Sequence, residues 1–247
     1  MSIRHLFDYS QPLVAAATVL SVGFVVVSGV LGYVAYTVKV SDDMITVTGS
    51  AKEMVRADAV RWTIQLETKT GTESQQAGID RLEAAQKRIA AYLAGKGVTE
   101  VESPVASVYP NYSYPDRSEP IFTGYTVSRP IIVRSSDVAA LSALANDLSK
   151  LQGTGYTVST NSLELTYSKL DEMRVKLLTQ AIGDAEARAR AIAEESGRSV
   201  HVLRSASSGV VQVLPAGGID ISDYGSYDTQ SMSKDIMVTV RAEFSLR

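Results

Sequence analysis

The stretch that decides the kind of fold is VRWTIQLE, at residues 60–67. Apolar side chains at the even positions, from Val60 to Leu66, alternate with polar side chains at the odd positions, from Arg61 to Glu67. A repeat of two residues is the pattern of a β-strand that buries one face and exposes the other to water. The stretch therefore predicts a sheet with one apolar face, on which helices pack, and one polar face.

Strand and helix patterns alternate on both sides of this stretch. A short strand is predicted before it, at residues 44–50, and a helix after it, at residues 72–95, where Ile79, Leu82 and Ile89 mark one apolar face. A loop with three prolines, at residues 110–124, joins the next two strands. The remaining predicted elements are strands at 101–109 and 125–133, a helix at 136–153, a strand at 156–167, a helix at 168–197, and strands at 200–214 and 235–246.

These elements give the order ββ-α-ββ-α-β-α-ββ over residues 44–247. Paired strands separated by helices predict an α+β domain with a largely antiparallel sheet and with helices packed on one face. In the longest helix, small residues recur at every fourth position, namely Ala181, Ala185, Ala189 and Ala193. This stripe predicts that the helix packs closely against a neighbour such as the sheet.

The amino-terminal part of the chain is of a different kind. Residues 13–38 contain no charged side chain, and residues 1–12 form a short tail before them. At about 1.5 Å per residue, a helix of this length exceeds the roughly 30 Å of a bilayer core. The run is also longer than the apolar stretch of a cleavable signal peptide. We therefore expect one transmembrane anchor at residues 13–38, in contact with the lipid bilayer, and one folded domain at residues 44–247.

Small residues lie four positions apart at two places in this span, Ala17 with Ser21 and Ser28 with Gly32. The spacing allows two helices to approach closely, but the tolerance of small residues in lipid explains it equally well. One arginine precedes the span and one lysine follows it, so the flanking charges do not decide its orientation.

The composition of the 247 residues excludes several kinds of chemistry. No cysteine is present, so the chain has no disulfide, no thiolate metal site and no cysteine nucleophile. The formal net charge of -3 gives no basic footprint for nucleic acid. The two histidines, His5 and His201, are too few for a histidine cluster. We expect no cofactor, no metal and no nucleic-acid partner.

Single candidates for a catalytic or metal site are weak. His201 lies in an apolar stretch without a nucleophile elbow, so a structural role is the favoured interpretation. Asp220, Asp223 and Asp228 share one loop but lack the spacing of a calcium loop, and we expect solvated carboxylates there. The sequence thus offers no catalytic constellation, and we expect a protein that is not an enzyme.

Tyrosines gather in the two long loops of the predicted domain. Tyr112 and Tyr114 lie in the first, and Tyr224 and Tyr227 lie in the second, at residues 215–233. Long loops often carry function, and tyrosine is enriched at protein interfaces. These four residues are candidates for contacts with another copy of the chain or with a ligand. The alternative is that their rings only pack the loops against the sheet.

Several segments, taken in order, resemble the SIMPL domain family, also called the domain of unknown function 541. The quoted segments are ITVTGSAKEMVRADAVRWTIQLET at 45–68, SVYPNYSY at 107–114, FTGYTVSRPIIVRSSDV at 122–138 and DAEARARAIAEESGRSV at 184–200. No single segment is diagnostic, but their ordered sum is specific and covers nearly all of residues 44–247. Pro130 departs from the family pattern, because a proline inside a strand indicates an edge or a bulge.

The resemblance implies a bacterial protein that is exported or tethered to a membrane. Some members are described as periplasmic or outer-surface proteins, and some as ring-like oligomers with a role in oxidative stress. It implies a single-pass protein of the inner membrane, with residues 40–247 in the periplasm or outside. The hypothesis is an envelope protein that forms a ring-like homo-oligomer with a scaffolding, enclosing or stress-protective role. The alternative is a module that binds a small ligand or peptide through the tyrosine-bearing loops.

Overall fold

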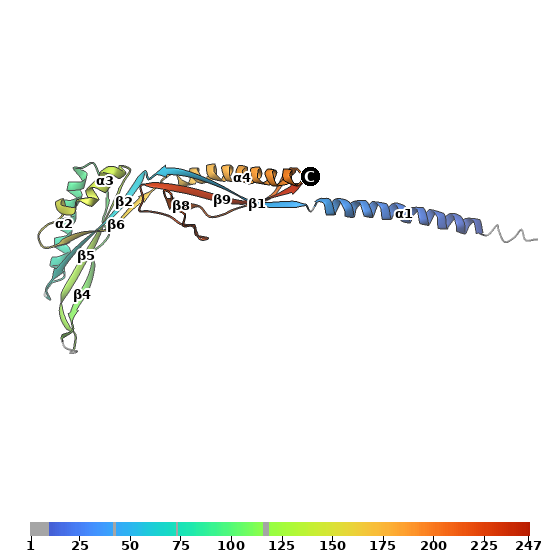
Figure 1. The fold of residues 1–247 in the computed structure, drawn as a ribbon. Coiled ribbons are helices and arrows are strands. Elements are labelled where there is room, and N and C mark those ends of the chain that lie inside the picture. Colours follow the sequence, from blue (N-terminus) through green and yellow to red (C-terminus); the bar gives the residue numbers. More distant parts are fainter. Residues whose placement is uncertain (1–9, 42, 73, 116–118) are drawn as a thin grey trace, which may run out of the picture. The chain divides into compact units, whose positions relative to one another are not determined.

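The structure is a computed structural model that describes residues 10–41, 43–72, 74–115 and 119–247 (Figure 1). The chain is of mixed α+β class with antiparallel sheets, as predicted. It forms two compact units, each built from separate segments. The first unit holds Met1–Ser50, Thr179–Gly209 and Thr239–Arg247, and the second holds Ala51–Leu178 and Val210–Val238. The prediction of one domain over residues 44–247 stays a prediction.

The second unit contains a five-stranded sheet. Its strands are ordered β3-β5-β2-β6, and β4 also pairs with β5. All the pairs are antiparallel. The bounds are β2 Ala59–Thr70, β3 Glu100–Glu102, β4 Ser107–Ser113, β5 Ile121–Ser135 and β6 Thr157–Thr166.

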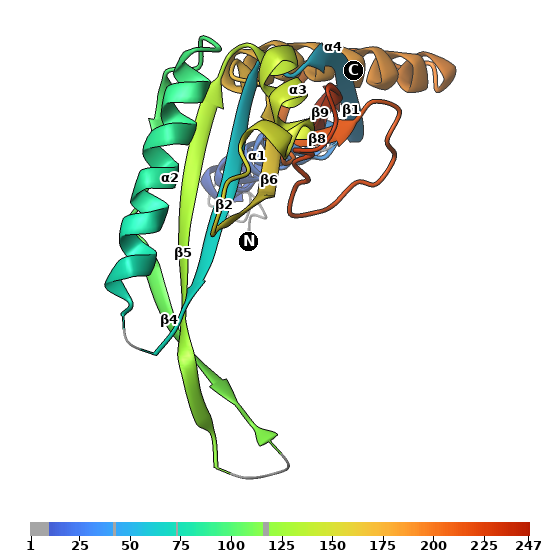
Figure 2. The same ribbon diagram turned by 90° about the vertical axis from the view of Figure 1, so that its left-hand side faces the viewer.

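Two helices cover the apolar face of this sheet, α2 (Gln76–Ala94) and α3 (Val138–Asn146), as Figure 2 shows for α2 along β5 and β2. A short 3-10 helix at Leu148–Lys150 follows α3. Trp62, Ile64 and Leu66 of β2 are fully buried there, so the period-two prediction for residues 60–67 is confirmed. Facing side chains from the helices complete the core, including Leu82, Ile89, Leu93 and Leu141.

A smaller core lies elsewhere in the second unit. The carboxyl half of β1 (Met44–Arg56), the start of α4 (Leu170–Glu195), β8 (Gln212–Pro215) and the start of β9 (Ser233–Leu246) contribute to it. Its buried members are Val55, Met173, Leu177, Val213, Ile236 and Val238.

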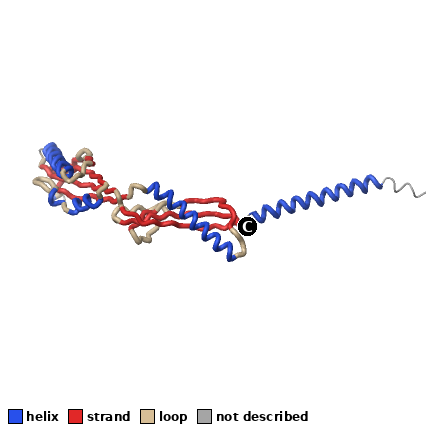
Figure 3. The backbone as a smooth tube through the Cα atoms, turned by 90° about the horizontal axis from the view of Figure 1, so that it is seen from above, coloured by secondary structure: helices blue, strands red, loops and turns tan. Residues whose placement is uncertain are grey.

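In the first unit, strands β1, β9 and β7 (Val200–Ser208) are neighbours in that order. Figure 3 shows helix α4 in blue beside the strands in red. The predicted alanine stripe of α4 is confirmed, because all four alanines are at most 1% exposed. The helix comes so close to β1 that a Cβ on Gly49 would lie 2.1 Å from Ala181 O and 2.4 Å from Ala185 N. The Ser50 N–H donates to the Asp184 carboxylate at 2.8 Å, and this bond lowers the pKa of Asp184.

We expect Gly49→Ala to destabilise the protein by about 1–3 kcal/mol, because backbone atoms must move to admit the methyl group. The matched control is Gly183→Ala on α4, where an added Cβ meets nothing within 4 Å. That change should stabilise the helix by about 0.5–1 kcal/mol. Urea unfolding of the full chain in detergent, followed by circular dichroism, measures both. Equal effects of the two changes would contradict close packing at Gly49.

Several predicted boundaries are wrong in detail. The strand predicted at 44–50 continues to Arg56, and the helix predicted at 136–153 ends at Asn146, before the short 3-10 helix. The strand predicted at 101–109 is divided into β3 and β4, and the strand predicted at 200–214 is divided into β7 and β8. The predicted loop at 110–124 is shorter, since β4 continues to Ser113 and β5 starts at Ile121. Pro110 is tolerated in β4 because β4 pairs with β5 alone and is an edge strand.

Candidate interaction surface

Aromatic rings form a row on the hairpin of β4 and β5. Tyr112 lies opposite Phe122, and the register shifts by one residue between Asn111 and Tyr112. The ring centroids of Phe122 and Tyr125 are 5.0 Å apart in an edge contact, and those of Tyr112 and Phe122 are 5.8 Å apart. The β-bulge thus brings three rings together. We call Tyr112, Phe122 and Tyr125 the aromatic row.

The aromatic row belongs to the hairpin of β4 and β5, which extends beyond helix α2 in Figure 2. Near the start of α2, Gly78 lies directly on the sheet, because an added Cβ would come within 2.6 Å of Val127 Cγ2. Gly124 of β5 lies beside the end of β2 and has a φ of +134°, and an added Cβ would come within 2.1 Å of Thr70 O. Glycine is therefore required where the backbone of β5 passes the end of β2. The hairpin of β4 and β5 continues beyond this point.

The outer part of this hairpin exposes large side chains to solvent. Tyr112 is 50% exposed and Tyr114 is 71% exposed, and Tyr109 and Ile121 are also more than half exposed. A two-stranded hairpin is only marginally stable on its own in water, and exposed apolar patches mark interaction sites. The predicted residues Tyr112 and Tyr114 are therefore accessible to a partner.

The second tyrosine pair lies on the loop between β8 and β9. Tyr224 is almost completely exposed, and Tyr227 is about half exposed and forms an isolated bridge with Val213. Ile219 and Ile221 on the same loop are also exposed. In Figure 2 this loop lies well apart from the tip of the hairpin of β4 and β5. The two tyrosine pairs thus present two separate surfaces rather than one.

Hydrogen bonds hold this loop in place although its apolar side chains are exposed. Gln212 Nε2 donates to Ser222 O at 2.5 Å, and the Gly217 N–H donates to the Asp235 carboxylate at 2.9 Å. The bond from Gly217, followed by the bond from Lys52, lowers the pKa of Asp235. These hydrogen bonds therefore fix the position of the loop backbone at the protein surface.

A buried ion pair fixes the end of the same loop. Lys234 is fully buried, and its Nζ donates to Asp228 O at 2.6 Å and to the Asp228 carboxylate at 3.0 Å. Burial raises the pKa of Asp228, but bonds from the Gln230 N–H, from Lys234 and from Ser231 outweigh it, so the net pKa is lowered. The sequence pattern gave no sign of this pair, because a lysine beside a polar loop is usually exposed.

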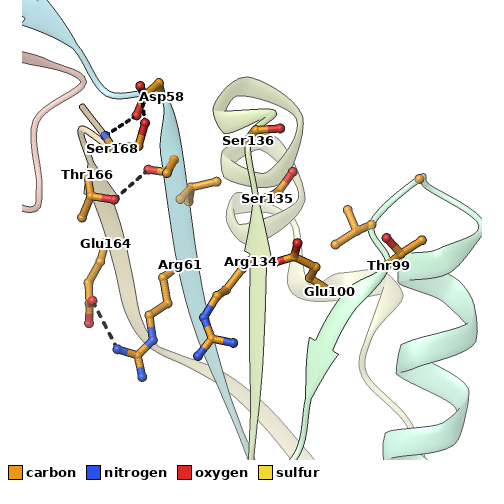
Figure 4. Close-up of a pocket in the computed structure, with 14 residues that line it drawn as sticks. Asp58, Arg61, Thr99, Glu100, Arg134, Ser135, Ser136, Glu164, Thr166 and Ser168 are labelled. Carbon is orange, nitrogen blue, oxygen red and sulfur yellow. Dashed lines mark hydrogen bonds and ion pairs between the residues drawn. The ribbon is translucent and has the colours of Figure 1, made fainter. Parts of the chain in front are cut away.

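A polar depression of about 670 Å³ lies at one end of the five-stranded sheet (Figure 4). Arg61 and Arg134 are cross-strand neighbours in it, and Arg61 lies 3.8 Å from the Glu164 carboxylate. Asp58 accepts bonds from the Ser168 N–H at 2.7 Å and from its hydroxyl at 2.8 Å. Arg134 pairs with Glu102 outside the depression at 3.0 Å. These ionic groups thus already have protein partners, which is typical of a solvated charged face.

The remaining sequence candidates are distributed over the chain. His201 is exposed on β7, and His5 lies outside the described residues. Asp220 and Asp223 are exposed on the loop, while Asp228 belongs to the buried pair. Among the described residues, no group of three or more His, Cys, Asp or Glu side chains could hold a metal ion.

Helix α1 (Ser10–Ser41) contains one segment, Ala16–Tyr36, that is long and apolar enough to cross a membrane, with a mean hydropathy of 2.0. Its length and composition are those that a membrane anchor or a signal sequence requires. This segment includes Ala17, Ser21, Ser28 and Gly32, and all four residues are exposed. The Ser21 hydroxyl donates to Thr18 O at 2.9 Å. The packing role of these four residues stays a prediction.

The chain was compared with known proteins. Residues 45–244 match the family model described as SIMPL, a protein of unknown function (DUF541). No curated protein matches the chain. A crystal structure of a hydantoinase/carbamoylase family amidase from Burkholderia ambifaria matches with 14% identity and a TM-score of 0.19. The match covers 53% of this chain and 35% of the amidase, and a likeness this low carries no argument about fold or function.

Proposed function

The chain belongs to the SIMPL family, and we propose that it is a membrane-anchored bacterial envelope protein that assembles with copies of itself into a ring. In this proposal α1 crosses the inner membrane once, and the rest of the chain lies in the periplasm or outside. The assembly acts as a scaffold, encloses a space or protects against stress. It does so without catalysing a reaction.

The observation that carries this proposal is the exposed aromatic hairpin. Tyr109, Tyr112, Tyr114 and Ile121 are each at least half exposed. Aromatic side chains bury about 150–250 Å² each when covered, so the hairpin offers several hundred Å². A stable protein interface buries roughly 800 Å² on each partner. The hairpin therefore supplies a large share of one interface, and a second copy of the chain is the partner that we propose.

The apolar helix α1 supports the same proposal. Anchoring in one bilayer confines all copies to a plane with the same orientation, and this raises their effective concentration. Contacts that are weak in solution then accumulate into a stable assembly. A repeated head-to-tail contact closes into a ring when its rotation divides a full turn, and otherwise it gives a filament. Copies held in one membrane plane favour closure.

Removal of the aromatic row tests this function. We expect the full-length protein in detergent to form a multimer, and the double variant Tyr112→Ala with Phe122→Ala to lower its mass to that of a monomer or dimer. The physical reason is the loss of the apolar area that a second copy covers. Light scattering of the micelle-bound protein measures the mass. The control is Tyr224→Ala on the other loop, which should leave the mass unchanged.

Two results would contradict the proposal. If the unaltered protein is a monomer or a simple dimer at micromolar concentration, there is no ring. If the double variant keeps the mass of the unaltered protein, the aromatic row does not hold the assembly together. A reproducible catalytic turnover that one point change abolishes would contradict the non-enzymatic part.

The second candidate function is a module that binds a small ligand or a peptide. The loop at residues 216–232 favours it, because hydrogen bonds hold the loop while Tyr224, Ile219 and Ile221 stay exposed. In that case Tyr224→Ala abolishes binding without changing the mass of the particle. Binding that is lost on Tyr112→Ala with no change of mass also favours this second function.

A further inference from the structure

We propose that the open edges of the first unit's sheet pair between copies, so that β7 of one copy lies beside β1 of the next. Figure 1 shows β1 and β9 side by side, and the strand order β1-β9-β7 leaves one edge on β1 and the other on β7. The inference rests on the self-assembly proposed above. It adds a contact through backbone hydrogen bonds, which is separate from the aromatic row of the second unit.

Strand β7 has the character of an uncovered edge. Eight of its nine residues are exposed, and they include the apolar Val202 and Leu203. Its pairing with β9 shifts register twice, between Val200 and Leu203 and between Leu203 and Ser205. An edge strand presents a row of N–H and C=O groups that can pair with another strand. This edge therefore offers a template for one more strand.

Neither edge has the residues that proteins commonly use to prevent such pairing. Lysines and prolines on an edge strand block the addition of another strand. Residues 44–50 of β1 read MITVTGS and contain no charge and no proline, and since the Ser50 N–H is bound to the Asp184 carboxylate of α4, the open stretch of this edge ends before Ser50. Strand β7 reads VHVLRSASS and contains no lysine and no proline, and Arg204 is its one permanently charged residue. Edges without lysine and proline, and with a single charged residue between them, favour strand addition.

The directions of the two edges show how a second copy fits. The Leu246 N–H donates to Asp43 O at 2.9 Å, which places the start of β1 at the end of β9. Strand β7 runs antiparallel to β9 and begins at the same end, with Val200 opposite Leu246. Strands β1 and β7 therefore run parallel to each other. If a neighbouring copy is related to the first by rotation about an axis that runs along the strands, its β1 lies beside β7 of the first copy.

The anchor selects this arrangement over a symmetric one. Only two residues separate the end of α1 at Ser41 from the start of β1 at Met44. All copies in one bilayer must therefore start β1 on the membrane side. Antiparallel pairing of β7 with β7 around a two-fold axis would place these starting points on opposite sides. A second copy in parallel register is the occupant that we propose for each edge.

Cysteine cross-linking tests this inference directly, because the natural chain has no cysteine. Thr46→Cys or Thr48→Cys in β1 is combined with one cysteine at each position from 202 to 206 of β7. Within one copy β9 separates the two strands, so the cysteines lie about 9–10 Å apart and exceed the roughly 7 Å limit for a disulfide. A disulfide in a double variant must therefore join two copies.

We expect at least one double variant, oxidised as full-length protein in membranes, to give a ladder of linked dimers, trimers and larger species. The single variants should give no ladder. Dimers formed by a β7 single variant would overturn the inference in favour of symmetric β7 pairing. The absence of cross-links in every double variant would also overturn it. If that sample is still a multimer by light scattering, only the edge contact fails, whereas a monomer contradicts the proposed function as well.

Discussion

Replacement of Trp62 by alanine is expected to lower the free energy of unfolding by about 3–5 kcal/mol, the range for large-to-small changes of buried aromatic residues. Trp62 is completely buried in the core of the second unit, and its Nε1 donates to the Thr160 hydroxyl at 3.1 Å. The change leaves a cavity under α2 and α3 and removes this hydrogen bond. Urea unfolding of the full chain in detergent, followed by circular dichroism, measures the effect.

The matched control is a residue on the same strand, β2, whose side chain lies on the opposite face of the sheet. Arg61 is about half exposed, and its ion pair with Glu164 is long, at 3.8 Å. Exposed ion pairs contribute about 0–1 kcal/mol, so Arg61→Ala should have a small effect. Trp62→Phe keeps most of the ring volume and should fall between the two. If Trp62→Ala is no more damaging than Arg61→Ala, the assigned core of the second unit is wrong.

The confirmed predictions concern strands and helices that bury one face, because burial of one face gives a regular spacing of apolar or small residues. The alternation from Val60 to Leu66 matches the buried face of β2, and the spacing of Ala181 and Ala185 matches the face of α4 that packs on β1. Glu186 and Arg190, four residues apart on α4, form an ion pair at 2.5 Å, as this spacing on a helix favours. Each of these patterns depends on a local repeat, which a reader of one sequence can see.

The positions of strand interruptions depend on neighbours far away in the chain. Pro130 indicated an edge or a bulge, yet β5 has partners on both sides. The structure resolves this, because Pro130 lies opposite the break between β3 and β4, where Ser103 donates to Pro130 O at 3.1 Å. No ladder N–H is needed at that point. The sequence alone does not show which strand lies beside residue 130.

The candidate site was predicted in part. Tyr112 and Tyr114 were identified from composition, and both are exposed. Phe122 and Tyr125 were missed as members of the same row, since the β-bulge in the hairpin turns them to one side. A bulge changes which side chains share a face, and it leaves no mark in a simple alternation.

The buried pair of Lys234 and Asp228 was missed for a different reason. The loop that carries Asp228 is rich in polar residues, and such a sequence predicts solvated carboxylates. In the structure the Asp228 side chain is only 11% exposed, and the N–H groups of Gln230 and Ser231 donate to it. Lys234, the second residue of β9, pairs with it. The two partners are only six residues apart, and what the sequence does not show is that both side chains are largely buried.

Replacement of Lys234 by methionine is therefore expected to lower the free energy of unfolding by about 3–5 kcal/mol at neutral pH, because it leaves the buried Asp228 carboxylate without its cation. The double variant Lys234→Met with Asp228→Asn should recover much of this loss, since both charges are then removed. Urea unfolding followed by the fluorescence of Trp62, the single tryptophan, measures the stability. If the double variant is as unstable as Lys234→Met alone, the unpaired carboxylate is not the cause.

The pH dependence gives an independent test of the same pair. The pKa of Asp228 is lower in the folded protein than its ordinary value, so its contribution to stability is fully present above the unfolded pKa of about 3.9. This contribution is lost as the pH falls through the folded pKa. In Lys234→Met the cation is absent and burial favours the protonated acid, so acid should harm the variant less. The gap in stability between the unaltered protein and the variant should thus shrink from pH 7 to about pH 3. A gap of equal size at both pH values would show that packing of the lysine chain, rather than its charge, stabilises the loop.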